Sequence, residues 1–156
     1  MTQQKIVVFQ SHSTPAEMGY NDKANVIDEQ GFITPHYAAS CCPNEYSPKT
    51  GKPWPKEYAF LAPIEYFFEC IEHEKHGKCL LVNGGKECET RNCNINHDNL
   101  RIATQIFVHC GESDTWRGSA GCLTIHPLDW DAFMLNFFTW EKGVLRIIDC
   151  SKMGDA

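Results

Sequence analysis

The chain has 156 residues, of which 42% are hydrophobic and 22% charged, and its 20 acidic and 14 basic side chains give a net charge of −6. This length and composition are typical of one globular domain over residues 1–156 with a buried core, and they exclude a largely disordered chain. The Lys and Arg residues form no stripe, which argues against a nucleic-acid interface. No apolar run approaches the ~20 residues of a membrane span.

The first residues, MTQQKIVVFQSHSTP, contain an apolar run of only four residues, at positions 6–9. A secretory signal has a longer apolar region. We therefore expect the chain to be synthesised in the cytoplasm without a signal peptide.

Short apolar runs at 5–9 and 25–28, followed by a turn at Gly31, predict two strands. Residues 35–55 include five prolines and the Cys41–Cys42 pair, a composition typical of a long irregular loop.

The next segment, PIEYFFECIEHEK at 63–75, is interpreted as an amphipathic helix. Pro63 suits a first helical turn, Gly77 suits a helix end, and apolar side chains recur at helical spacing, at Ile64, Phe67, Phe68 and Ile71.

Residues 78–85 predict a strand followed by a turn, and apolar runs at 105–110 and 121–127 predict two further strands. Residues 89–99 are polar and Asn-rich, which predicts a loop. Pro127 opens a second predicted helix, whose apolar face would comprise Trp130, Phe133, Met134, Phe137 and Phe138. A final strand is predicted at 143–150. The pattern predicts a single β-rich α+β domain, a β-sandwich or barrel with two packed helices.

Nine cysteines are present, an odd number that leaves at least one thiol unpaired. A full disulfide framework is disfavoured in a chain without an export signal. Cys41 and Cys42 are adjacent, and four residues separate Cys88 from Cys93. Each could form a structural bridge after export, bind a metal, or be a small buried apolar residue.

The segment HCGESDTWRGSAGC, at 109–122, begins with His109 at the end of one predicted strand and ends with Cys122 at the start of the next. If these strands are neighbours, thiol and imidazole meet at one edge of the sheet, where the imidazole can take the thiol proton. Small residues between them would let backbone N–H groups approach a reacting carbonyl and form an oxyanion hole. The pair therefore predicts a cysteine nucleophile.

The stretch VHCG…GSAGCLTI resembles the signature of the L,D-transpeptidase catalytic domain, the YkuD-like family. His109 corresponds to the upstream catalytic His of that family, and Ser119, Gly121 and Cys122 correspond to its Ser, Gly and nucleophilic Cys. Leu123 corresponds to the apolar residue that follows. The resemblance covers residues 105–128 and implies a YkuD-like catalytic fold.

The resemblance also implies roles for the neighbours of this pair. The residue after the catalytic His orients the imidazole through its backbone carbonyl, which would be that of Cys110. Gly121 would lie in the oxyanion region, and Ser119 would contact substrate. We expect Arg117 to bind a substrate carboxylate and Trp116 to cover the site.

The implied substrate is the peptide stem of peptidoglycan, attacked at the carbonyl between meso-diaminopimelate and D-alanine. Water, another stem or a free D-amino acid would resolve the acyl-enzyme, giving L,D-carboxypeptidase, crosslinking or exchange activity. No cofactor, metal, nucleic acid or membrane is expected.

A wall substrate and a chain without an export signal together suggest an antibacterial effector. Such a protein would be delivered by a secretion system, for example type VI, to a target cell's periplasm. We would then expect an immunity protein and a secretion-machine component as partners. A phage peptidoglycan-degrading lysis protein is the alternative.

A zinc-binding module is the alternative from another class. One candidate ligand set comprises Cys88, Cys93, His97, Cys110 and His126, and a second comprises His73, His76 and Cys79. Neither set has the paired spacing of a structural zinc site. His12, His36, His73, His76, His97 and His126 are interpreted as surface or loop residues. A third possibility is a non-catalytic domain that binds peptidoglycan or a partner.

Overall fold

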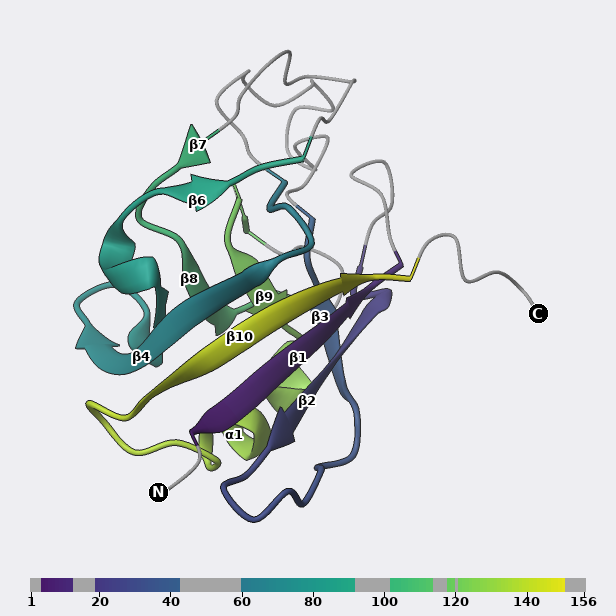
Figure 1. Ribbon diagram of the computed structural model, residues 1–156, viewed down its shortest axis with the longest axis vertical. Helices are drawn as coiled ribbons and strands as arrows, with labels where there is room; N and C mark the ends of the chain where they lie inside the picture. The colour runs from purple at the N-terminus through teal and green to yellow at the C-terminus, as the bar shows by residue number, and fades with distance from the viewer. Residues whose placement is uncertain are drawn as a thin grey trace.

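A computed structural model describes residues 4–12, 19–42, 60–91, 102–113, 118–119 and 121–150. Eight strands close into a barrel in the order β1-β10-β4-β5-β8-β9-β3-β2 (Figure 1). Their bounds are β1 Lys5–Ser11, β2 Asp22–Ile27, β3 Tyr37–Ser40, β4 Glu65–His73, β5 Gly77–Val82, β8 Phe107–Cys110, β9 Leu123–Ile125 and β10 Lys142–Asp149. The β-rich class predicted from the sequence is confirmed.

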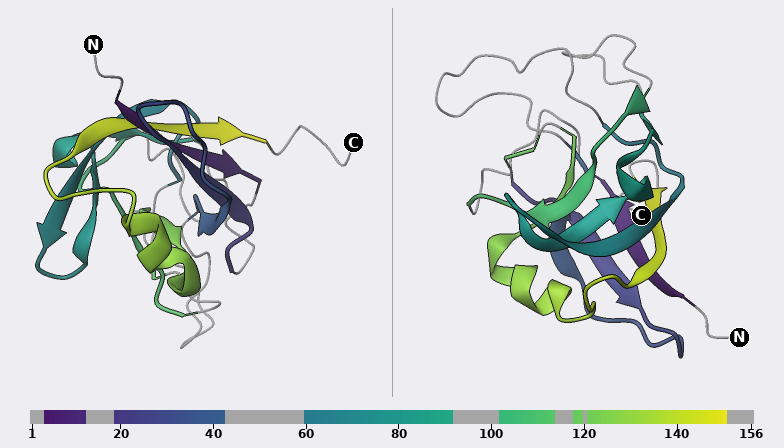
Figure 2. Two further views of the ribbon diagram at one scale, coloured as in Figure 1. Left: turned by 90° about the horizontal axis from the view of Figure 1, so that it is seen from below. Right: turned by 90° about the vertical axis from the view of Figure 1, so that its left-hand side faces the viewer.

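Two smaller strands, β6 (Cys88–Glu89) and β7 (Ile102–Ala103), pair with each other outside the barrel. A 3-10 turn, η1 (Asn83–Gly85), follows β5. The α-helix α1 (Pro127–Met134) lies at one end of the barrel, and the β6–β7 pair lies at the other (Figure 2).

In two places of the barrel, adjacent strands run parallel, and all other adjacent strands run antiparallel. The terminal strands form one parallel pair, β1–β10, with Lys5 opposite Gly143 and Ser11 opposite Asp149. The other is β8–β9, with Val108 opposite Leu123. Closure removes the free strand edges that an open sheet would expose.

Alternate side chains of β1, β4 and β10 fill the barrel, as the period of a β-strand requires. Val7 and Phe9 of β1 are fully buried, and so is Leu145 of β10 beside them. The largest fully buried side chains are Tyr66, Phe9, Phe133, Leu61, Leu80, Leu123, Ile125, Leu145, Val7, Val26 and Val82.

The helix predicted at 63–75 is wrong, because this segment forms β4. Tyr66, Phe68 and Cys70 point into the barrel, whereas Phe67 is 67% exposed. The same residues carry both a two-residue and a helical apolar repeat. Pairing with β5 on one side and β10 on the other supplies the backbone hydrogen bonds of a strand. Gly77, at φ +67, is the first residue of β5, directly after the turn at 74–76.

The predicted second helix is confirmed as α1, although it is shorter than its apolar pattern suggests. His126 caps its N-terminus, where its Nδ1 accepts a hydrogen bond from the Leu128 N–H at 3.0 Å. Phe133 and Met134 are buried, but Phe138 lies beyond the helix and is 66% exposed. The described residues therefore contain one α-helix instead of the two expected.

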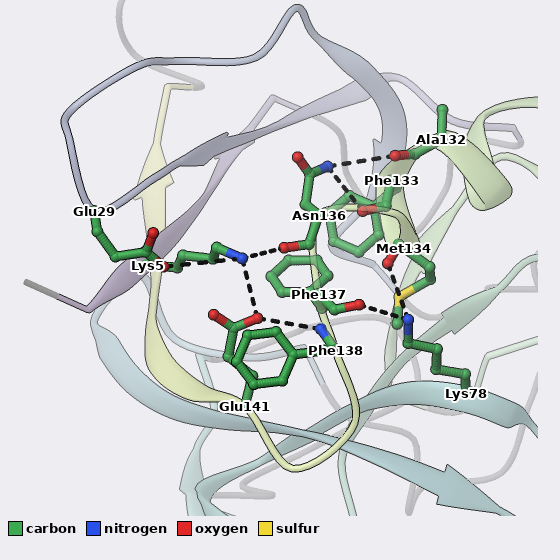
Figure 3. Close-up of polar contacts among 10 residues, drawn as sticks. All are labelled: Lys5, Glu29, Lys78, Ala132, Phe133, Met134, Asn136, Phe137, Phe138 and Glu141. Atoms are coloured by element: carbon green, nitrogen blue, oxygen red, sulfur yellow. Dashed lines mark hydrogen bonds and ion pairs between the residues drawn. The ribbon is translucent and has the colours of Figure 1, made fainter.

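Two lysines hold the segment that follows α1 (Figure 3). The Lys5 ammonium donates to the Asn136 carbonyl and pairs with the Glu141 carboxylate at 3.1 Å. The Lys78 ammonium donates to the Phe137 carbonyl at 2.5 Å. Positive charge beside carbonyls near a helix C-terminus is electrostatically favourable. Through these two lysines, β1 and β5 hold the segment after α1 at this end of the barrel.

The loop predicted at 35–55 is wrong for Tyr37–Ser40, which form β3 by pairing with β2 and β9, and its residues 43–55 lie outside the described residues. The predicted loop at 89–99 lies outside them from residue 92 onward. In the described part of the chain, no helix has the length and apolar character needed to cross a membrane.

Candidate functional site

β8, which carries His109, and β9, which begins directly after Cys122, are neighbours in the barrel. In the parallel β8–β9 pair, His109 lies opposite Thr124. Cys122 immediately precedes β9, and its Sγ accepts a hydrogen bond from the Phe107 N–H at 3.3 Å. Since Phe107 and His109 are two residues apart on one strand, their side chains share a face. The thiol thus lies against the backbone of Phe107, two residues before His109 on β8.

His109 is oriented by the backbone of the next residue. Its Nδ1 lies 2.8 Å from the Cys110 carbonyl oxygen. A carbonyl can only accept, so Nδ1 carries the proton and Nε2 keeps its lone pair. Burial lowers the pKa of His109 below 6.5, and Lys75 lowers it further, whereas the Cys110 carbonyl opposes the shift. The imidazole is therefore neutral at pH 7.

Cys122 is a protonated thiol in this state. Burial raises its pKa above 9.0, while the Phe107 N–H and the Lys75 ammonium act in the opposite direction. Among the described residues no hydrogen bond joins its sulfur to His109. A neutral thiol beside a neutral imidazole can react once its proton transfers to the base, and such contacts often tighten only when substrate binds.

Gly111, directly after β8, is required by a packing contact with Tyr20. A Cβ at this position would lie 1.7 Å from Tyr20 Oη, which no real contact allows. Tyr20 donates from that hydroxyl to the Ser113 carbonyl at 2.8 Å and packs edge-on against His126. No local sequence pattern predicts this contact, because Tyr20 is far away along the chain.

Ser119 organises the turn that leads into Cys122. Its hydroxyl donates to the Cys122 carbonyl at 2.6 Å and accepts from the Gly121 N–H at 3.1 Å. Ser119 is buried, so these bonds are shielded from water. The Gly121 N–H is thereby already engaged. Gly118, at φ +66, packs against the Glu112 side chain.

Four aromatic rings form a cluster: those of His73, His76, Phe107 and His109. The His76 and His109 rings are stacked, with centroids 4.5 Å apart and planes 10° from parallel. The His73 ring stacks with the His76 ring, with centroids 4.9 Å apart. Its centroid also lies 4.8 Å from that of the Phe107 ring. A helix at 63–75 does not predict this cluster, whereas a β-hairpin with its turn at 74–76 places His73 and His76 next to each other.

A cavity of about 230 Å³ lies against this cluster. It has one cationic side chain, Lys75, and one carboxylate, Glu112. Its lining is completed by His76, His109, Cys110, Gly111 and Gly118. A small molecule or the end of a peptide in this cavity would contact His109 directly.

Two predicted substrate-binding residues, Trp116 and Arg117, lie outside the described residues. Of the zinc candidates, Cys93 and His97 also lie outside them. His126 uses its Nδ1 to cap α1.

Metal-ligand clusters and disulfides are both missing from the described part of the chain. No three His, Cys, Asp or Glu side chains there are grouped so that they could hold a metal ion. No disulfide joins the described cysteines to one another: Cys41, Cys42, Cys70, Cys79, Cys88, Cys110, Cys122 and Cys150.

Comparisons with protein-family models, curated proteins and solved structures give no match.

Proposed function

We propose that this protein is a cysteine-dependent enzyme of peptidoglycan stem peptides, of the L,D-carboxypeptidase or L,D-transpeptidase type. The observation that carries the proposal is the arrangement around His109. Its Nδ1–H is held by the Cys110 carbonyl, and the neighbouring strand begins directly after Cys122. The family resemblance of residues 105–128 supplies the substrate class, and a YkuD-like identity of the barrel is part of this proposal.

In the proposed reaction, His109 Nε2 takes the proton from Cys122 as the sulfur attacks the carbonyl between meso-diaminopimelate and D-alanine. The tetrahedral intermediate collapses, and the imidazolium returns its proton to the departing D-alanine amine. A thioester between Cys122 and the shortened stem remains. Water or an acceptor amine then attacks this thioester, with His109 again as the base.

The oxyanion of each tetrahedral intermediate needs nearby N–H donors. Because the Gly121 N–H already donates to Ser119 Oγ, we assign the donor role to the Cys122 N–H. Gly121 then acts indirectly, since its hydrogen bond helps to hold the turn on which that amide lies.

The proposed substrate lies outside the cytoplasmic membrane of bacteria. We therefore propose that the protein acts in the periplasm of a target cell, as a delivered antibacterial effector. An immunity protein in the producing cell is the partner that this role requires.

Mass spectrometry of purified muropeptides tests the reaction. Incubation of disaccharide-tetrapeptide with the wild-type protein should release D-alanine and leave a tripeptide stem, or give a new crosslink or exchanged terminus. Cys122→Ala should abolish every product, and Cys110→Ala serves as a matched control that retains activity. An unchanged muropeptide profile with folded wild-type protein would contradict the proposal.

A further inference from the structure

We propose that His76 is a positioning residue for His109 and acts through the flat face of its ring. This inference rests on the proposed function, in which His109 is the base. The sequence placed His76 among ordinary surface histidines, whereas the structure stacks it against the imidazole at 4.5 Å and 10°.

The turn that carries His76 is held in place by three features. His73 Nδ1 accepts hydrogen bonds from the Lys75 N–H at 3.1 Å and from the His76 N–H at 3.3 Å. Gly77 adopts the left-handed φ of +67 that favours glycine. The antiparallel pairing of β5 with β8 then brings this turn beside the C-terminal end of β8.

The stack restrains the one motion that would misplace the base. Rotation of the His109 ring about its Cβ–Cγ bond would break the bond from Nδ1 to the Cys110 carbonyl and turn Nε2 away from its working direction. A parallel ring at van der Waals distance opposes that rotation, because the turning ring would collide with it. The hydrogen bond acts within the plane of the His109 ring, and the stacked His76 ring acts perpendicular to that plane. Together the two contacts fix the orientation of the His109 ring.

His76 acts by its ring face and not by proton exchange. Burial, together with His109, His73 and Lys75, lowers its pKa to about 4, so it is neutral at pH 7. When His109 accepts the thiol proton, the resulting imidazolium faces a neutral ring. The His76 ring therefore adds no like charge beside it.

The test compares His76→Phe, which keeps a flat ring, with His76→Leu, which keeps an apolar side chain without one. His36→Leu, at an exposed histidine, is the matched control. The first readout is the ¹⁵N NMR spectrum of the His109 imidazole, which reports its tautomer without any substrate. The second is the separation of kcat from KM on muropeptides, and thermal unfolding verifies that each variant is folded.

In the wild-type protein and in His76→Phe, we expect His109 to be mainly in the Nδ1–H tautomer, with similar kcat. In His76→Leu, we expect mixed tautomers and a loss of roughly 10- to 100-fold in kcat with little change in KM, as misplacement of a catalytic group produces. An unchanged tautomer in His76→Leu, or an equal disturbance in His76→Phe, would overturn the inference. If the wild type is inactive while the tautomers respond as expected, the proposed function fails and the positioning role stands.

Discussion

The His109 imidazole donates its Nδ1 proton to the carbonyl of Cys110, the next residue in the chain, across 2.8 Å. This contact leaves Nε2 as the nitrogen that can accept a proton, and it uses only the backbone of Cys110. The imidazole orientation is therefore independent of the Cys110 thiol, which itself donates to the Gly111 carbonyl at 3.2 Å.

His109→Ala should lower kcat/KM on muropeptides by roughly 10²–10⁴-fold, the usual contribution of positioned proton transfer. Cys110→Ala should retain most activity because its carbonyl remains. Since the pKa of His109 is lowered below 6.5, the base form persists into mildly acidic solution, and activity should fall only as the pH drops through that lowered value. If Cys110→Ala were the inactive variant, a role for the Cys110 thiol would replace this assignment.

Alkylation of Cys122 by iodoacetamide should accelerate steadily as the pH rises to 9 and beyond. With its pKa raised above 9.0, the thiolate is below about 1% at pH 7. Cys122 should nevertheless react before Cys79, which is fully buried and has a pKa of about 12. Peptide mapping at limiting reagent measures the order, and preferential labelling of Cys110 or Cys150 would count against Cys122 as the nucleophile.

Gly111→Ala should destabilise the protein by about 1–3 kcal/mol, because its Cβ overlaps the Tyr20 hydroxyl and ring. In the double variant Gly111→Ala with Tyr20→Ala the clash is absent, so the two costs should not add. Urea denaturation of the four proteins measures this coupling. Strictly additive free energies of unfolding would show that Tyr20 does not pack over Gly111.

Ser119→Ala should cost about 1–3 kcal/mol of stability, because it leaves the Gly121 N–H and the Cys122 carbonyl without their partner in a buried turn. Ser119→Thr keeps the hydroxyl and is the control. We also expect slower alkylation of Cys122 and lower kcat in the Ala variant. Equal stability and equal alkylation rates in both variants would remove Ser119 from the organisation of this turn.

Expression of the chain in the bacterial cytosol should be harmless, whereas fusion to a periplasmic signal should cause swelling or lysis, because only then does it reach the wall. Cys122→Ala should abolish this toxicity, since in the proposed reaction the sulfur forms the covalent intermediate. Growth curves and muropeptide profiles of the expressing cells measure both effects. Equal toxicity from the two compartments, or toxicity that survives Cys122→Ala, would contradict the proposed role.

Local sequence patterns were sufficient for most strands and for the start of α1. The apolar runs at 5–9, 78–85, 105–110 and 143–150 each coincide with a strand of the barrel. Pro127 is the first residue of α1. These features depend on neighbours in the chain, such as a run of apolar residues or the fixed φ of proline. The sequence also predicts that the strand ending near His109 and the strand beginning near Cys122 could be neighbours, and β8 and β9 do pair, with Cys122 directly before β9.

Tertiary structure decided between helix and strand for β4. Tyr66, Phe68 and Cys70 fit a two-residue repeat, while Ile64, Phe67, Phe68 and Ile71 fit a helical one. Only the hydrogen bonds to β5 and β10 select the strand, and β10 lies more than 70 residues further along the chain.

The neighbours of the candidate base were likewise set by the fold. His76 reaches His109 because the β4–β5 turn lies against β8, and Tyr20 reaches Gly111 across 91 positions of sequence. Side-chain identity determined which chemistry each residue can perform. Sheet register determined which residues meet, because a contact between distant segments leaves no periodic signal in either one.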